Sequence, residues 1–98
     1  MGRDQVITVL RLHQDDLRRR GVLHAALFGS VARGEATASS DIDLLIDLDP
    51  AALIDLFGYV EITQYLEDLF AAPVDVTNRK QLKALVRANA ERDAVSAF

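Results

Sequence analysis

Two short segments carry residue types that can do chemistry on a phosphate: GSVARG at 29–34 and SDIDL at 40–44. In the first, Gly29 lets the backbone turn tightly and come close to a ligand. Ser30 would then stand at a helix start, where free N–H groups and a hydroxyl bind phosphate oxygen, and Arg33 would add a charge-assisted bond. An ordinary strand-to-helix turn with an exposed arginine is the simpler alternative. The segment is not a P-loop, because the Gly-x-x-x-x-Gly-Lys-Ser/Thr pattern is absent.

The second segment places two carboxylates one residue apart. On a strand Asp41 and Asp43 would share a face, with side chains about 6 to 7 Å apart. Mg²⁺ takes oxygen ligands and usually binds one or two protein carboxylates together with substrate phosphate. Acids that alternate along a strand can also be its solvated face, which is what we expect of Asp47 and Asp49. The adjacent phosphate turn favours the metal site for the first pair.

A third carboxylate, Asp75, lies in the otherwise apolar segment PVDVT at 73–77. An acid in such a strand either faces solvent at a sheet edge or belongs to a site, and we favour the second. In a nucleotidyl transfer it would accept the proton of the attacking hydroxyl. His13 and His24 have no partners at ligand spacing, and we expect His13 on a helix surface. These residues together imply phosphoryl or nucleotidyl transfer.

Hydrophobic periodicity predicts the elements that position these residues. Strands are expected at Val22–Phe28, Asp41–Leu48 and 73–77, a helical turn at Val31–Gly34, a loop at Glu35–Ser40, and helices at Gln5–Arg20, Ala51–Phe70 and after Asn78. The two later helices should turn apolar side chains inward, namely Leu53, Leu56, Phe57 and Val60 in one, and Leu82, Leu85 and Val86 in the other. The order α-β-(turn)-β-α-β-α predicts an α/β or α+β fold with a small mixed sheet flanked by helices.

Composition narrows the class of protein. The 98 residues predict a single domain over 1–98, and the absence of cysteine excludes disulfides and thiolate metal sites. No apolar run is long enough to cross a bilayer and no signal peptide is evident, so we expect a cytoplasmic protein without a membrane partner. The net charge of −4 argues against direct nucleic-acid binding. The arginines at 18–20 should end a helix before Gly21.

The joint pattern of GSVARG, SDIDL and VDV at 74–76 closely resembles the minimal nucleotidyltransferase family of the DNA polymerase beta-like superfamily. The resemblance covers nearly the whole chain in element order and implies a nucleotidyltransferase fold. It implies that Gly29 and Ser30 hold the triphosphate of ATP, with Arg33 and Ser40 as further nucleotide contacts. It also implies three catalytic carboxylates that bind Mg²⁺, or Mn²⁺ in its place: Asp41, Asp43 and Asp75.

Members of this family are commonly encoded beside a helical HEPN protein. In such pairs the HEPN protein is a toxic ribonuclease and the nucleotidyltransferase is the antitoxin, which modifies a tyrosine with AMP. The resemblance therefore implies ATP and a HEPN toxin as partners, the latter in a hetero-oligomer. A chain this small has no room for a separate acceptor-recognition domain, which suits a protein acceptor that brings its own docking surface. Two alternatives stay open: a non-catalytic module that neutralises its partner by occlusion, and a small-molecule nucleotidyltransferase.

Overall fold

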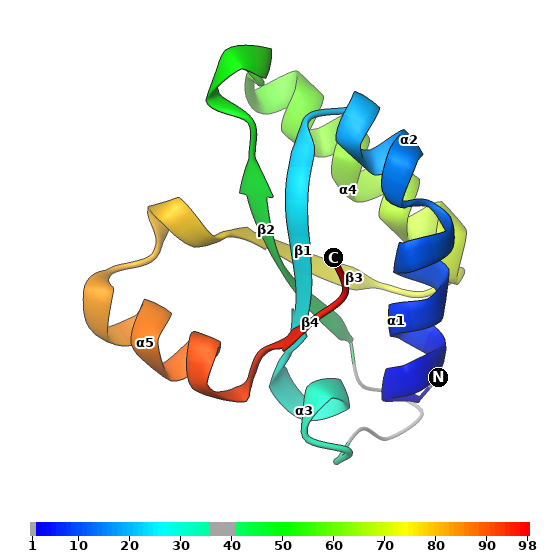
Figure 1. The fold of residues 1–98 in the computed structure, drawn as a ribbon, viewed down its shortest axis with the longest axis vertical. Coiled ribbons are helices and arrows are strands. Elements are labelled where there is room, and N and C mark those ends of the chain that lie inside the picture. The colour runs from blue at the N-terminus through cyan, green and yellow to red at the C-terminus, as the bar shows by residue number, and fades with distance from the viewer. Residues whose placement is uncertain (1, 36–40) are drawn as a thin grey trace.

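The core forms where one face of a four-stranded sheet meets helices from both halves of the chain (Figure 1). The computed structural model describes residues 2–35 and 41–98. Its strands are β1 (Val22–Phe28), β2 (Ile42–Leu48), β3 (Val74–Asn78) and β4 (Val95–Ser96), in the spatial order β3-β2-β1-β4. Because β2 is antiparallel to β1 and parallel to β3, the sheet is mixed, as predicted. The short strand β4 was not predicted.

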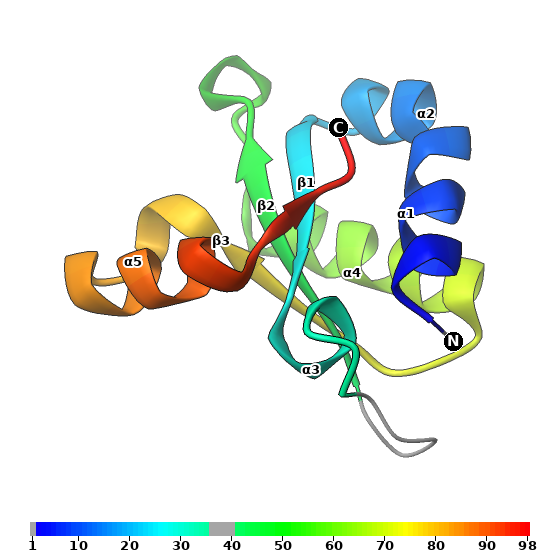
Figure 2. The same cartoon turned by 60° about the horizontal axis from the view of Figure 1, so that its bottom comes forward.

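Helices lie on both sides of this sheet. They are α1 (Arg3–Leu12), α2 (Gln14–Arg19), α3 (Gly29–Ala32), α4 (Leu56–Phe70) and α5 (Ala84–Asp93), with 3-10 turns η1 (Pro50–Ala52) and η2 (Arg79–Gln81). The helices α1, α2 and α4 pack on one face, and α5 lies on the other side (Figure 2). The fully buried side chains include Val6, Leu10, Leu17, Leu27, Leu44, Ile46 and Leu66. Within the described residues, no helix has the length and apolar character that crossing a membrane requires.

The single helix predicted for Gln5–Arg20 is wrong, because α1 and α2 are separate helices that meet at His13. The N–H of His13 is shared between the carbonyls of Val9 and Leu10, at 3.2 Å each, which tightens the last turn of α1. Its ring nitrogen Nδ1 also lies 2.9 Å from the Val9 oxygen. His13 is therefore half-buried at a junction, edge-on to the Tyr65 ring, and not on a helix surface. Gly21 follows α2 with a φ of 100°, as the predicted helix end requires.

The long helix predicted from Ala51 begins later, at Leu56. Leu53 adopts a φ of 49°, in the left-handed region, and so ends η1. Asp55 then caps α4, because its Oδ1 accepts a hydrogen bond of 2.8 Å from the N–H of Gly58. Helical spacing alone did not reveal this cap. Gly58 consequently lies in the first turn of α4 and not in the helix interior.

Several apolar side chains predicted to point inward from these helices are exposed, namely Leu53, Leu56, Phe57, Val60 and Val86. The core already receives Ile62, Leu66 and Phe70 from the opposite side of α4. Asn78 caps η2, accepting a bond of 3.2 Å from the N–H of Lys80, and α5 starts only at Ala84. Leu82 is half-buried, and the side chain of Leu85 lies outside the described residues.

Candidate functional site

The turn between β1 and α3 brings Gly29 against the side chain of Asp43. Antiparallel pairing of β1 with β2 places Phe28 opposite Asp43, so the next residue lies beside the carboxylate. Gly29 has a φ of 74°. A Cβ added there would overlap Oδ2 of Asp43 and lie 3.0 Å from its Cγ. Both the backbone conformation and the close approach therefore favour glycine at this position.

Ser30 follows in the first turn of α3, where it is half-buried. The N-cap residue of α3, Phe28, makes no side-chain hydrogen bond to the first turn of the helix. The N–H groups of a first turn have no intrahelical partner, and without a side-chain cap they can bind an anion. The predicted strand-to-helix turn is thus present, at the edge of the sheet where β2 begins (Figure 2), and phosphate binding there stays a prediction.

Three predicted carboxylates gather next to this turn. Parallel pairing of β2 with β3 puts Asp43 and Asp75 at matching positions, and Asp41 immediately precedes β2. Asp43 is half-buried, whereas Asp41 and Asp75 are exposed. Loss of hydration, followed by the negative charges of Asp75 and Asp41, raises the pKa of Asp43. The three acids therefore lie within one another's electrostatic field.

Arg33 is already engaged in ion pairs. Its Nε lies 3.1 Å from Oε2 of Glu35 and its Nη1 lies 3.6 Å from Oδ2 of Asp93. To contact a phosphate, the Arg33 guanidinium would have to leave Glu35 and Asp93, or bind the phosphate in addition to them. Its positive charge already acts on the site, because it opposes the rise in the pKa of Asp43. Ser40, the other predicted nucleotide contact, lies outside the described residues.

The carboxylates fit a hard dication in kind, because Mg²⁺ prefers oxygen ligands. The close approach of Gly29 also leaves the Asp43 carboxylate uncovered by a side chain from that turn. Among residues 2–35 and 41–98, however, no group of three or more His, Cys, Asp or Glu side chains is arranged to hold a metal ion. A site of two carboxylates completed by substrate phosphate is the arrangement that these residues could form.

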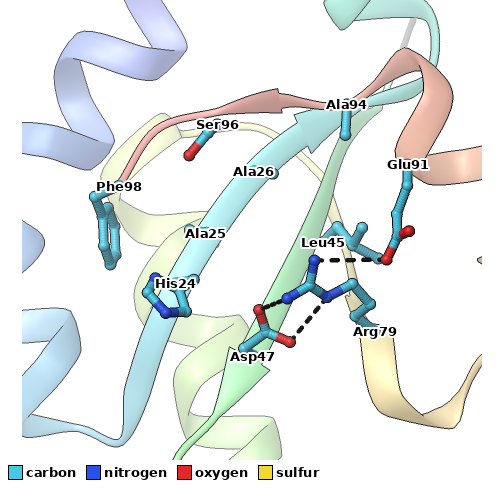
Figure 3. A pocket seen from close by; sticks show the side chains of 10 residues that line it. All are labelled: His24, Ala25, Ala26, Leu45, Asp47, Arg79, Glu91, Ala94, Ser96 and Phe98. Carbon is cyan, nitrogen blue, oxygen red and sulfur yellow. Dashed lines mark hydrogen bonds and ion pairs between the residues drawn. The ribbon is translucent and has the colours of Figure 1, made fainter.

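One acid was placed wrongly by the sequence pattern. Asp47, expected on the solvated face, is 9% exposed and forms a two-point ion pair with Arg79 (Figure 3). Nε of Arg79 donates to Oδ1 of Asp47 at 3.0 Å, Nη2 contacts Oδ2, and Nη1 lies 3.5 Å from Oε1 of Glu91. This part of the sheet is covered because Arg79 of η2 and Glu91 of α5 lie over it. Asp49 caps η1 by accepting a bond from the N–H of Ala51 at 2.9 Å.

This ion pair forms part of the wall of a cavity of about 340 Å³. The residues that line it are His24, Ala25, Ala26, Leu45, Asp47, Arg79, Glu91, Ala94, Ser96 and Phe98 (Figure 3). Side chains alternate along β2, so Asp43, Leu45 and Asp47 share one face of the sheet, and the cavity opens on the same face as the carboxylates. Among the residues that the structure describes, none of the predicted site residues lines it, and no local signal in the sequence indicated it.

Comparisons with known proteins agree with the fold described above. Residues 10–96 match the family of nucleotidyltransferase domains. The protein adenylyltransferase MntA of Thermococcus cleftensis is 33% identical over 93 residues, which is 94% of this chain and 92% of that protein. A solved structure described as a minimal nucleotidyltransferase has a TM-score of 0.82 at 28% identity and covers 97% of this chain and 95% of its own. A toxin–antitoxin structure with AMP-PNP shares the fold, with a TM-score of 0.72 at 19% identity over 100% of this chain and 73% of that one.

Proposed function

Because this chain belongs to the minimal nucleotidyltransferase family, we propose that it transfers AMP from ATP to a hydroxyl of a partner protein. The acceptor we propose is a tyrosine of a HEPN toxin, so that the chain acts as an antitoxin. The observation that carries this proposal is the approach of Gly29 to the Asp43 carboxylate, with Asp75 in register on the next strand. The Thermococcus relative is a protein adenylyltransferase, and a structure of the same fold is a toxin–antitoxin with AMP-PNP, an ATP analogue.

In the proposed reaction the acceptor oxygen forms a bond to the α-phosphorus of ATP. The bond from that phosphorus to the oxygen bridging to the β-phosphate breaks, and pyrophosphate leaves with the electron pair. The hydroxyl proton passes to a carboxylate, for which exposed Asp75 is placed next to Asp43. Ser30 and the first-turn N–H groups of α3 bind the phosphates, and Gly29 lets them approach the acids.

We propose Mg²⁺ as the cofactor, held by Asp41 and Asp43 and completed by the phosphates of ATP, with Asp75 beside them as the proton acceptor; Mn²⁺ suits the same oxygens. The ion would offset the charge of the triphosphate and of the leaving oxygen. Burial, and after it the like charges of Asp75 and Asp41, raises the pKa of Asp43, and a bound cation would relieve the repulsion between these charges. Titration calorimetry with ATP should give tight binding with Mg²⁺ and weak binding with EDTA. Equal affinity in the two conditions would contradict a metal-bridged triphosphate.

Turnover tests the proposed transfer. A small molar fraction of the chain, with ATP and Mg²⁺, should modify and inactivate an excess of the proposed HEPN partner. Intact mass spectrometry should show that each modified partner gains the mass of one or more AMP groups. Asp75→Asn should lose this activity, whereas Asp15→Asn, which changes an exposed acid on α2, should keep it. Inhibition that follows the molar ratio, needs no ATP and survives Asp75→Asn would instead indicate occlusion.

A further inference from the structure

Four large apolar side chains are exposed together where the chain enters α4. The exposed fractions are 86% for Leu53, 73% for Leu56, 78% for Phe57 and 56% for Val60. The described chain exposes three other large apolar residues, at separate places on α1, β1 and α5: Leu12, Leu23 and Val86. Single exposed apolar residues are ordinary, but a contiguous group marks an interaction surface. We call the four residues the α4 surface.

The α4 surface is not part of the core. The helix buries Ile62, Leu66 and Phe70 against the sheet. With 3.6 residues per turn, Leu56, Phe57 and Val60 fall on the other side of the same helix, where Gln64 and Asp68 continue toward its end as polar residues. Only the first turns of α4 are therefore apolar on both sides, and the outer side has no cover within the described chain.

Two hollows adjoin the α4 surface. One, of about 370 Å³, is lined in part by Leu48, Ile54, Leu56 and Tyr59. The other, of about 360 Å³, is lined in part by Leu48, Leu53 and Ile54. The start of α4 is held in place because the Tyr59 hydroxyl donates to the Val76 carbonyl on β3. A ridge of apolar side chains beside apolar hollows is the shape that receives an amphipathic helix.

The charges around the α4 surface indicate whether a second copy of this chain or a different, basic partner binds there. Asp49 and Asp55 line the hollows and Glu61 follows Val60 on the helix, with Lys80 as a cation at the edge. A two-fold contact with a second copy would use the same patch twice and bring these acids together. Like charges across an interface are unfavourable, whereas lysine or arginine beside apolar side chains would be complementary.

We propose that the α4 surface docks a helix of the partner protein that carries the acceptor hydroxyl, a helix whose apolar side chains are flanked by lysine or arginine. The identity of that partner rests on the proposed function. The surface and the carboxylates lie at opposite ends of β2 (Figure 1). The steps from Asp43 to Asp49 correspond to about 20 Å of strand, and α4 packs on the sheet face opposite to the one that carries Asp43 (Figure 2). A partner helix bound at the α4 surface therefore leaves the carboxylates uncovered, and another part of the partner has to bring the acceptor hydroxyl to them.

The test uses the proposed HEPN partner and measures, by calorimetry without ATP, the dissociation constant of its complex with this chain. Phe57→Ser should raise that constant at least about tenfold, the loss typical of a buried aromatic anchor. The matched control is Leu12→Ser, which changes a residue that is 75% exposed on α1 and should leave the constant within about twofold. Circular dichroism and ATP binding should be unchanged in both variants. Transfer by Phe57→Ser should show a raised KM for the partner with kcat retained.

Equal affinity of the two variants for the HEPN protein would overturn the docking proposal. Self-association of the chain by sedimentation velocity, abolished by Phe57→Ser, would also overturn it by showing that a second copy is the occupant. If Phe57→Ser weakened binding of the partner while the wild-type chain transferred no AMP, the docking surface would be supported and the proposed function refuted. The two proposals therefore fail separately.

Discussion

A single methyl group at Gly29 would test the geometry of the candidate site. Alanine at a φ of 74° takes up the left-handed conformation, which is unfavourable by about 1–2 kcal/mol for a residue with a Cβ. The added Cβ would lie 3.0 Å from Cγ and 3.2 Å from Cβ of Asp43, and would overlap its Oδ2. The carboxylate therefore has to rotate away, and forcing a side chain off its rotamer adds about 0.5–1.5 kcal/mol.

Gly34 is the matched control for this change. It has the same φ of 74°, and a Cβ added there would meet nothing within 4 Å. Gly34→Ala should therefore carry only the backbone penalty, whereas Gly29→Ala should lose about 1.5–3.5 kcal/mol of stability in total. In a domain of this size each kcal/mol lowers Tm by about 4–8 °C. Misplacing a reacting group by about 1 Å can reduce a rate about 100-fold, so Gly29→Ala should also lose most AMP transfer.

The assays are thermal unfolding by circular dichroism and AMP transfer by intact mass spectrometry. In an Asp43→Ala background only the Cβ of residue 43 remains, 3.2 Å from the added Cβ, so the additional loss from Gly29→Ala should fall most of the way to that of Gly34→Ala. Equal Tm losses at the two glycines, together with normal transfer by Gly29→Ala, would refute the contact between Gly29 and Asp43. Loss of transfer in Gly34→Ala would show that backbone strain, and not the carboxylate, is responsible.

Two further predictions concern the acids of β2. Burial and the charges of Asp75 and Asp41 raise the pKa of Asp43 above its ordinary value of 3.8. The folded protein therefore holds the proton of the Asp43 carboxyl more tightly than the unfolded chain does. As the pH rises above 3.8, ionisation of Asp43 then lowers the free energy of unfolding. Asp43→Asn should therefore unfold at higher urea than wild type at pH 7, with a smaller difference at pH 3 and no transfer; no gain at pH 7 would contradict this. Arg79→Ala should lower the free energy of unfolding by about 1–3 kcal/mol, because it leaves Asp47 unpaired. This loss is smaller than that expected for a fully buried ion pair, because Arg79 is 41% exposed. Urea unfolding should also show that replacing both residues by leucine recovers part of the loss, and a fully additive loss would contradict the pairing.

The sheet was predictable because its signals are local. Strict alternation of apolar and acidic residues predicted β2 to within one residue of its start, and the apolar run that ends at Gly29 predicted the bounds of β1. The helices were less predictable because their ends depend on single hydrogen bonds. Asp55 sets the start of α4 through its side chain, and α1 ends where the backbone N–H of His13 is shared between two carbonyls. Apolar spacing carries no information about either.

The candidate site was predictable in its residues and not in its surroundings. Gly29, Asp43 and Asp75 meet because antiparallel and parallel pairing of predicted strands leaves few other arrangements. Asp47 repeats the position of Asp43 on the same face of the strand, so the local pattern cannot tell them apart. What separates them is Arg79, which is 32 residues away in the sequence. A contact of that range has no local signal.

The α4 surface shows why apolar periodicity assigned too many residues to the core. Leu56, Phe57 and Val60 support a helix by composition, but a helix packed on a sheet buries one side only. Leaving these side chains in water favours association, whereas the acids at the other end of β2 repel one another. One end of the strand therefore favours an apolar partner and the other a cation. These opposite requirements let the two ends be tested independently, with Phe57→Ser changing the first and Asp43→Asn the second.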